Sequence, residues 1–370
     1  MRFSATCKMG LESTVALQLK QLSAQNVTVC DARVYFEGDA ALLARSLLWL
    51  RTAERVFLII AEFSATSFDE LFENTKALNW KNYLLRNSNI HVNGKSAKSV
   101  LFSVSDCQSI VKKAIVENLK SAYKTDLLPE SGKEIIIEVG ILKNAVTIAI
   151  DCCGTGLSRR GYRTYNVAAP LSETLGAGIV MLSQFYKTRT LCDPMCGSGT
   201  IPIEAAMIAK RLAPGLNRTF AAENLHFLPT GIFDVAREDA KASVSNEPYE
   251  IEGADIDERS IGLCKLHAKK AGIMATWTVR ELSRLTLSSK SGVVACNPPY
   301  GERMMTAHEV VSLYGSMRRV FDAAPEYQIN IITAHREFEK LYGKCADKRR
   351  KLSNGGMPCT LYQYFPKQPL

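Results

Sequence analysis

The sequence predicts an α/β protein in which an α+β region precedes a doubly wound, largely parallel sheet with an antiparallel hairpin at its edge. Across residues 188–333, short apolar strand segments alternate with helical segments, and this alternation is typical of a parallel sheet covered by helices. Two further strand segments flank an Asn-Gly-Gly turn at residues 354–356, which predicts the closing hairpin. A chain of 370 residues is long enough for two to three domains.

The first third of the chain predicts the α+β region. We expect a strand at residues 100–104, a helix that opens with a capping box at Ser105, and paired strands at residues 134–139 and 145–150. A connector rich in glycine and arginine follows at residues 154–163. A domain boundary is therefore predicted just before this connector.

Composition narrows the functional classes. Lysine and arginine number 46 against 37 aspartate and glutamate residues, and the resulting net charge of +9 suggests a polyanionic partner. The 11 cysteines include no Cys-x-x-Cys pair and the five histidines are scattered, so we expect free thiols in a reducing, cytoplasmic compartment and no metal site. The N-terminus lacks the apolar core of a signal peptide, and charges interrupt the most apolar stretch, residues 40–63, so no membrane contact is expected.

The sharpest motif is DPMCGSGT at residues 193–200, which follows an apolar strand segment and precedes a helix. Gly197 and Gly199 allow a tight turn and the close approach of a ligand to the backbone. Ligands of open α/β sheets bind beyond the carboxyl ends of the strands, where this loop is expected to lie. The motif is neither a GxGxxG dinucleotide fingerprint nor a phosphate-binding loop. We interpret it as a ligand-binding loop rather than a plain glycine turn.

Two later strand segments also end in polar motifs. In GADID at residues 253–257, the Asp255 carboxylate could accept both hydroxyls of a ribose, whereas Asp257 fits a helix N-cap equally well. In NPPYGER at residues 297–303, the two prolines lack N–H donors, so the Asn297 amide oxygen and the Pro298 carbonyl can together accept both hydrogens of an exocyclic amine. Tyr300 offers a flat face on which a base can stack.

In this order, DPMCGSGT, GADID and NPPYGER resemble motifs I, II and IV of class I S-adenosylmethionine-dependent methyltransferases that modify exocyclic amines. The segment at residues 158–180 and the closing KLSNGGMPCTLYQY resemble THUMP-domain RNA methyltransferases, and GLESTVALQLKQL near the N-terminus resembles their ferredoxin-like portion. The resemblance covers essentially the whole chain and is to the bacterial 23S rRNA guanine-N2 methyltransferases in their single-module form. It implies a ferredoxin-like region at residues 1–55, a THUMP domain at 56–153, and a Rossmann-like class I methyltransferase domain at 154–370, of which 154–187 form the connector and a motif X-like segment.

The resemblance also implies a cofactor, S-adenosylmethionine, and roles for individual residues. Asp193, Gly197 and Gly199 would hold the methionine part of the cofactor and Asp255 its ribose, while Glu281 stands where the family usually has an aspartate that reads the adenine amine. The implied cofactor-binding set comprises Asp193, Met195, Cys196, Gly197, Ser198, Gly199, Thr200, Asp255, Ile256, Glu281, Arg163 and Thr174. The implied catalytic set comprises Asn297, Pro298 and Tyr300. We expect the N-terminal domain to be the RNA platform, with an RNA-binding set of Lys95, Lys98, Lys112 and Lys113, although each single lysine fits a solvated surface charge equally well.

The implied reaction is methyl transfer to the exocyclic N2 amine of a guanosine in 23S rRNA, either in naked RNA or in a large-subunit assembly intermediate. The motif NPPY also serves adenine-N6 and glutamine methyltransferases, so the motif alone leaves the acceptor amine open. A non-catalytic RNA-binding ribosome-assembly protein with an inactive cofactor fold is the alternative from another class. The intact residues that argue against it are Asp193, Asp255, Asn297 and Tyr300.

Overall fold

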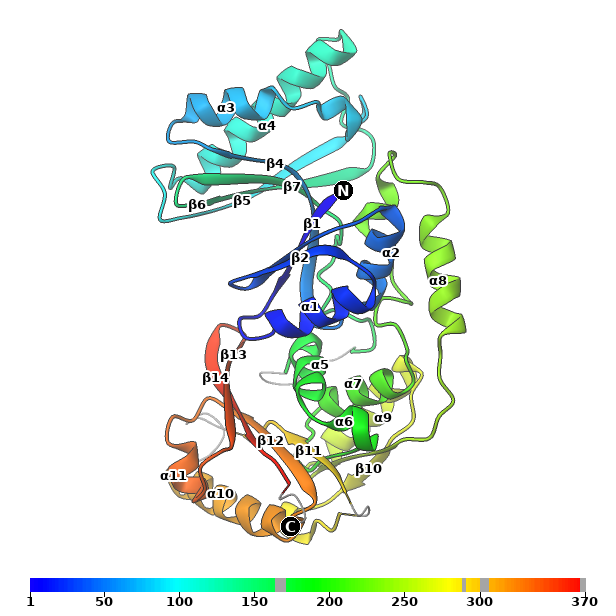
Figure 1. Ribbon diagram of the computed structural model, residues 1–370, viewed down its shortest axis with the longest axis vertical. Helices are drawn as coiled ribbons and strands as arrows, with labels where there is room; N and C mark the ends of the chain where they lie inside the picture. The colour runs from blue at the N-terminus through cyan, green and yellow to red at the C-terminus, as the bar shows by residue number, and fades with distance from the viewer. Residues whose placement is uncertain (164–170, 288–290, 300–305, 367–370) are drawn as a thin grey trace.

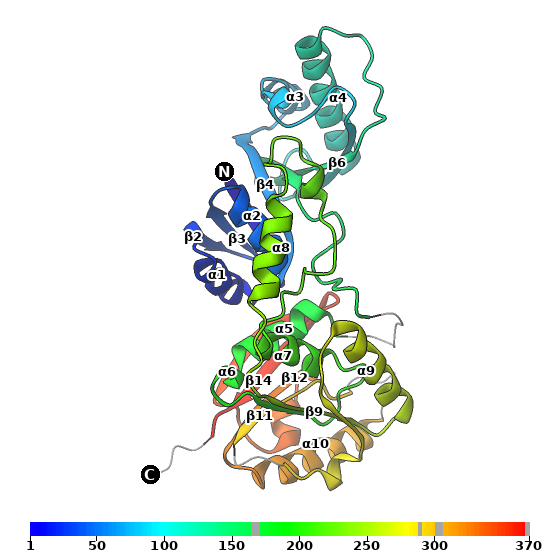
Figure 2. The ribbon, with the colours of Figure 1, turned by 90° about the vertical axis from the view of Figure 1, so that its right-hand side faces the viewer.

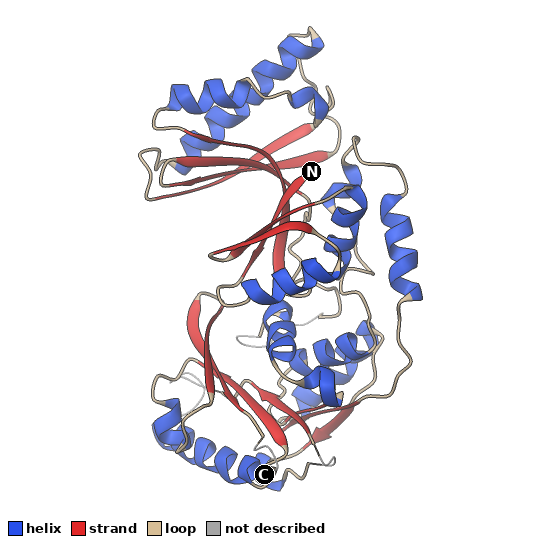
Figure 3. Cartoon of the chain, in the orientation of Figure 1, coloured by secondary structure: helices blue, strands red, loops and turns tan. Residues whose placement is uncertain are grey.

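The protein is built around two seven-stranded sheets, which lie one above the other in the ribbon of Figure 1. The computed structural model describes residues 1–163, 171–287, 291–299 and 306–366. Its strands and helices are coloured in Figure 3, where the upper sheet belongs to the N-terminal region and the lower sheet to the C-terminal region.

The N-terminal sheet has the order β2-β3-β1-β4-β7-β6-β5. Its central strand β4 (Ala53–Ser64) pairs with β1 through Ala53 to Leu58 and with β7 through Phe57 to Ser64, so one long strand joins two smaller α+β units. The predicted boundary between the ferredoxin-like region and the THUMP domain, between residues 55 and 56, falls within β4 and stays a prediction. The other strands are β1 (Arg2–Cys7), β2 (Gln25–Cys30), β3 (Arg33–Glu37), β5 (Asn89–Ala97), β6 (Glu134–Leu142) and β7 (Ala145–Asp151). The helices are α1 (Glu12–Gln21), α2 (Ala40–Trp49), α3 (Phe68–Lys76), η1 (Trp80–Asn82) and α4 (Val104–Tyr123).

The strand expected at residues 100–104 is wrong, and so is the helix start at Ser105. Helix α4 begins at Val104, after Ser103, and the residues just before it form no strand. Their backbone bonds to side chains instead: the Val100 N–H donates to the Asn144 side chain at 2.8 Å, and the Leu101 carbonyl accepts from Ser96 Oγ at 2.5 Å. Tertiary contacts therefore override a local β preference in this segment.

The C-terminal sheet has the order β10-β9-β8-β11-β12-β14-β13. The first five strands are parallel, while β14 and β13 are antiparallel and form the edge hairpin. The predicted doubly wound sheet with its closing hairpin is confirmed. The strands are β8 (Thr190–Asp193), β9 (Glu250–Asp255), β10 (Thr276–Val279), β11 (Gly292–Cys296), β12 (Tyr327–Thr333), β13 (Lys348–Asn354) and β14 (Met357–Tyr364).

Helices cover both faces of this sheet. Figure 2 shows α5, α7 and α9 above the strands and α10 below them, and residues of α10 and α11 form a second apolar cluster with residues of β11, β12 and β14. The helices are α5 (Glu173–Leu182), α6 (Phe185–Thr188), α7 (Thr200–Ala209), η2 (Ala221–Asn224), α8 (Ile232–Ala242), α9 (Glu258–Ala271), η3 (Leu282–Arg284), α10 (Ala307–Asp322) and α11 (Phe338–Tyr342).

The two regions are packed together rather than loosely tethered. The insertion between α7 and β9 carries α8 up beside α2 (Figure 2), and the Gly215 N–H donates to the Leu48 carbonyl at 2.9 Å. From the hairpin, Arg350 Nη1 donates to the Gly10 carbonyl at 2.9 Å. One apolar cluster runs through residues of both sheets. In the described part of the chain, no helix has the length and apolar character needed to cross a membrane.

Candidate active site

The three sequence motifs meet at one edge of the C-terminal sheet. In the parallel registers, Asp193 at the end of β8 lies opposite Gly253 of β9, and Cys192 lies opposite Val294 of β11. The residues that follow β8, β9 and β11 therefore emerge side by side at the carboxyl ends of the strands, which is where ligands bind in open α/β sheets.

The loop between β8 and α7 depends on its two glycines for different reasons. Both have positive φ, +52° at Gly197 and +83° at Gly199. A Cβ at Gly199 would come within 3.0 Å of both the Cys264 sulfur and the Trp277 ring, so packing also excludes a side chain there. A Cβ at Gly197 would meet nothing within 4 Å. Gly199 thus holds the loop against α9 and β10, whereas Gly197 leaves backbone open to a ligand.

A buried carboxyl group begins this loop. Asp193 is 2% exposed, and its Oδ1 accepts the Met195 N–H at 3.2 Å. Burial, with a smaller contribution from the charge of Asp255, raises the pKa of Asp193 well above its usual range. A cationic or N–H donor group of a ligand would offset that penalty, so Asp193 is suited to bind one.

Asp255 and Asp257, two residues apart, have different roles. Asp255 accepts the Gly197 N–H at 2.9 Å and the Asp257 N–H at 3.0 Å, which ties the end of β9 to the glycine-rich loop. Asp257 is the N-cap of α9 and accepts from the Arg259 N–H and Ser260 Oγ, each at 3.0 Å. These bonds lower the pKa of Asp257. The helix-cap alternative therefore describes Asp257, while Asp255 keeps acceptor capacity for a ligand because a carboxylate has about four lone-pair sites.

Two more residues of the predicted cofactor-binding set follow β9 and β10 at this edge. Ile256 is 73% exposed, which is unusual for a large apolar side chain beside a sheet. Val279 lies opposite Asp255 in the register, and the exposed Glu281 follows two residues later, just before η3. The carboxyl edge of the sheet thus presents the apolar side chain of Ile256 together with the carboxylates of Asp255 and Glu281.

The Asn297 side chain has an unmet hydrogen-bonding requirement. It follows the fully buried strand β11, and its Oδ1 is buried without a hydrogen-bond partner in the described residues. Leaving a buried acceptor unpaired costs about 1–3 kcal/mol. Pro298, next along the chain, is buried and has no N–H to offer. Tyr300, the third predicted catalytic residue, lies outside the described residues.

Comparison with protein families identifies this arrangement. A profile described as the RMKL-like methyltransferase domain matches residues 160–363, and profiles of the RlmL ferredoxin-like domain and the THUMP domain match residues 2–57 and 65–151. The chain belongs to the RMKL-like methyltransferase family. The family and fold class predicted from the sequence are confirmed.

Relatives of this methyltransferase align over nearly its whole length. YpsC of Bacillus subtilis, whose name carries a provisional assignment as an RNA methyltransferase, is 40% identical and covers 98% of this chain and 95% of its own. The ribosomal RNA large subunit methyltransferase K/L of Photobacterium profundum is 30% identical over 98% of this chain. This chain spans 53% of that relative, about half its length.

Two solved structures are also similar over nearly the whole chain. SMU.472, provisionally described as a methyltransferase and complexed with SAH, is 35% identical with a TM-score of 0.95, covering 100% of this chain and 99% of its own. A protein from Listeria monocytogenes described as a predicted N6-adenine-specific DNA methylase is 42% identical with a TM-score of 0.93, covering 98% and 96%.

The remaining residues of the loop between β8 and α7 mainly hold the loop against the rest of the protein. Met195 is half-buried, and the sulfur of Cys196 lies 3.7 Å from that of Cys264. The Ser198 carbonyl accepts from Nδ1 of the buried His267 at 3.1 Å, an interaction that sequence reasoning missed. Burial lowers the pKa of His267. A lone histidine in an amphipathic helix carries no signal that would have revealed it.

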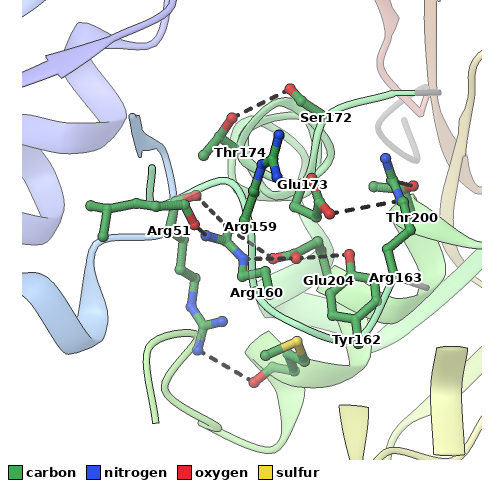
Figure 4. Close-up of polar contacts among 12 residues, drawn as sticks. Arg51, Arg159, Arg160, Tyr162, Arg163, Ser172, Glu173, Thr174, Thr200 and Glu204 are labelled. Atoms are coloured by element: carbon green, nitrogen blue, oxygen red, sulfur yellow. Dashed lines mark hydrogen bonds and ion pairs between the residues drawn. The ribbon is translucent and has the colours of Figure 1, made fainter. Parts of the chain in front are cut away.

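The connector residues join the loop to a buried charge network (Figure 4). Arg163 Nη2 donates to Thr200 Oγ1 at 2.6 Å, at the first residue of α7. Thr174 is fully buried and its hydroxyl donates to Glu54 of β4 at 2.5 Å, so it ties α5 to the N-terminal sheet. Whether Arg163 and Thr174 also contact the cofactor stays a prediction.

A second interaction missed in the sequence is the fully buried pair of Arg160 and Glu204. Arg160 Nε lies 3.0 Å from Glu204 Oε1 and Nη2 lies 3.2 Å from Oε2, with both side chains at most 1% exposed. Tyr162 donates to the same carboxylate at 3.1 Å, and Arg160 also donates to the Arg51 carbonyl at 2.6 Å. The available signal was Glu204 itself, the one charged residue of α7.

The four lysines predicted to bind RNA do not form one patch. Val92 and Gly94 of β5 face α4, so the next residue, Lys95, lies on the opposite face of the sheet, where it pairs with Glu138 at 3.1 Å. Lys112 and Lys113 lie on α4, and Lys112 pairs with Glu130 at 3.2 Å. The exposed Lys98 follows β5. Among the described residues, no group of three or more His, Cys, Asp or Glu side chains could hold a metal ion.

Proposed function

We propose that this protein is an S-adenosylmethionine-dependent RNA methyltransferase that methylates the exocyclic N2 amine of a guanosine in 23S rRNA. The observation that carries the acceptor chemistry is the buried Oδ1 of Asn297, which has no hydrogen-bond partner among the described residues and lies beside the N–H-free Pro298. A primary amine has two N–H donors, one for Asn297 Oδ1 and one for the Pro298 carbonyl.

S-adenosylmethionine is the cofactor of this family, in agreement with the SAH bound to SMU.472. It supplies an electrophilic methyl group on a sulfonium. The residues at the carboxyl edge fit it: the buried Asp193 carboxylate suits the ammonium of the methionine part, and Asp255 retains acceptors for the ribose hydroxyls. Ile256 offers an exposed apolar face to the adenine, with Glu281 as acceptor for the adenine amine.

Asn297 and Pro298 would act on the nucleophile. The lone pair of a guanine amine is delocalised into the ring, and positive charge develops on the nitrogen as it attacks. Hydrogen bonds from that nitrogen to Asn297 Oδ1 and the Pro298 carbonyl strengthen as this charge grows, so they stabilise the transition state more than the ground state. Tyr300 would hold the base by stacking, and a base within an RNA helix would have to be flipped out.

RNA is supported as the substrate class by the THUMP domain and by the names of the relatives. The finer choice of 23S rRNA, free or in a large-subunit assembly intermediate in the cytoplasm, rests on the K/L relatives, of which this chain spans 53%. The second candidate is adenine-N6 methylation, which the description of the Listeria structure favours.

The test is transfer of labelled methyl groups from S-adenosylmethionine to three acceptors: protein-free 23S rRNA from cells that lack the protein, duplex DNA, and total cell protein. We expect label in the RNA alone, and its loss with the Asn297→Ala variant. Label in DNA would move the assignment to the adenine branch, and label in protein to the glutamine branch. Cofactor binding without transfer to any acceptor would contradict an enzyme that acts on free RNA.

A further inference from the structure

An open groove lies where the connector meets the insertion, away from the carboxyl edge of the sheet. It has a volume of about 530 Å³ and is lined by Thr155, Arg159, Leu216, Asn217, Arg218, Thr219, Glu223 and Arg237. This set contains three arginines and one glutamate. The groove therefore carries an excess of positive charge.

The single glutamate of the groove is already neutralised. Glu223 Oε1 accepts from Arg237 Nη2 at 2.6 Å, and it also accepts the Phe220 N–H at 2.8 Å. Arg218 donates to the carbonyls of Gly156 and Arg159, at 2.8 and 3.1 Å, and no carboxylate lies among its partners in the described residues. Its positive charge is left uncompensated within the groove.

Arg159 is the residue most available to a ligand. Its side chain is exposed and makes no hydrogen bond or ion pair with any residue that the structure describes, and Figure 4 draws none from its guanidinium. Its backbone is nevertheless held at both ends, since its N–H donates to the Gly156 carbonyl and its carbonyl accepts from Arg218, both at 3.1 Å. The next residue is the fully buried Arg160. The Arg159 guanidinium is therefore available to an anion, and its backbone position is fixed.

The polar side chains that line the groove with Arg159 are also available to a ligand. The side chains of Thr155, Asn217 and Thr219 are exposed and have no hydrogen-bond partners in the described part of the chain. Hydroxyl and amide groups beside arginine are the usual partners of phosphate oxygens in nucleic-acid interfaces.

The groove is close to the reaction site along the chain. Arg159 lies four positions before Arg163, which contacts Thr200 directly after the glycine-rich loop. Four residues span at most about 14 Å. A strand of RNA bound in the groove would thus pass within reach of the cofactor loop.

We propose that this groove binds a backbone phosphate of the RNA substrate, with Arg159 as its principal contact. The inference deepens the proposed function and rests on it. It places an RNA contact at the junction of connector and insertion, in addition to the lysines of the THUMP domain. The residues of the groove lie outside the acceptor and cofactor motifs. The groove would therefore position the RNA and take no part in methyl transfer itself.

The test measures binding of protein-free 23S rRNA to the full-length protein at several salt concentrations. We expect Arg159→Ala to weaken binding roughly tenfold and to reduce the slope of log affinity against log salt by about one, as for loss of one phosphate contact. Arg159→Lys should restore the slope because it keeps the charge. The matched control is Lys340→Ala on α11, a lysine that is 77% exposed and should leave both quantities unchanged.

Cofactor affinity, measured by calorimetry, should be the same in all four proteins. An Arg159→Ala protein with wild-type RNA affinity and salt slope would overturn the inference while leaving the proposed function intact. Stabilisation by inorganic pyrophosphate that depends on Arg159, together with unchanged RNA binding, would identify a small phosphate ligand and also overturn it. A wild-type protein that binds cofactor but no RNA would refute the proposed substrate and the groove with it.

Discussion

Removing one partner of the Arg160–Glu204 pair should destabilise the protein more than any surface change. Both side chains are at most 1% exposed, so Glu204→Ala removes the carboxylate that is hydrogen-bonded to Arg160 and leaves the buried guanidinium with the carbonyls of Leu157 and Arg51 as its hydrogen-bond acceptors among the described residues. Breaking such a buried pair costs about 3–5 kcal/mol. With an unfolding entropy of about 2.1 cal/mol/K per residue over the 370 residues, this lowers the melting temperature by roughly 4–6 °C.

The assay is thermal unfolding by calorimetry, with Lys340→Ala as the control. Lys340 pairs with Glu337 at 3.2 Å, but these side chains are 77% and 62% exposed, so their interaction is worth about 0–1 kcal/mol. A double replacement, Arg160→Met with Glu204→Leu, should recover much of the loss because it removes the stranded charge. The reasoning would be refuted if Glu204→Ala melted within a degree of Lys340→Ala.

Three further predictions concern the candidate active site. Asn297→Ala should reduce turnover by roughly two to three orders of magnitude while cofactor affinity, measured by calorimetry, stays nearly intact; an equal loss of affinity would show that the residue is misplaced. Gly199→Ala should lower the melting temperature more than Gly197→Ala, because a Cβ at Gly199 approaches Cys264 to 3.0 Å whereas a Cβ at Gly197 meets nothing within 4 Å, and equal melting temperatures of the two variants would contradict the packing argument. Because burial lowers the pKa of His267, the unfolded state binds the extra proton more readily, so stability should be complete above about pH 6.5 and decline below it. Urea unfolding at pH 5.5 and 7.5 checks this, and His267→Asn, which can still donate to the Ser198 carbonyl, should lose that dependence.

The parallel sheet and the meeting of its motifs could be predicted because they follow from local rules. Asp193, Asp255 and Asn297 each follow an apolar strand segment, and parallel strands bring their carboxyl ends to one edge. The same local reasoning failed at residues 100–104, where the backbone bonds to the side chains of Asn144 and Ser96. Asn144 is distant in sequence, and neither side-chain contact leaves a periodic signal.

Interactions that cross between regions were the hardest to anticipate. Thr174 was assigned to the cofactor by resemblance, yet its hydroxyl donates to Glu54 of the N-terminal sheet. The insertion that places Arg218 against the connector carries no pattern that specifies its docking. The predicted RNA-binding lysines were chosen as basic residues of one domain, and the alternation of β5 puts Lys95 on the face opposite α4.

The central claim is that Asn297 and Pro298 present a guanine amine for methylation. Its most direct test is nucleoside analysis of 23S rRNA from cells lacking the protein, after incubation with the purified protein and labelled S-adenosylmethionine. The account predicts that the label elutes as N2-methylguanosine and disappears with Asn297→Ala. Label in N6-methyladenosine, or in a ribose-methylated nucleoside, would contradict it.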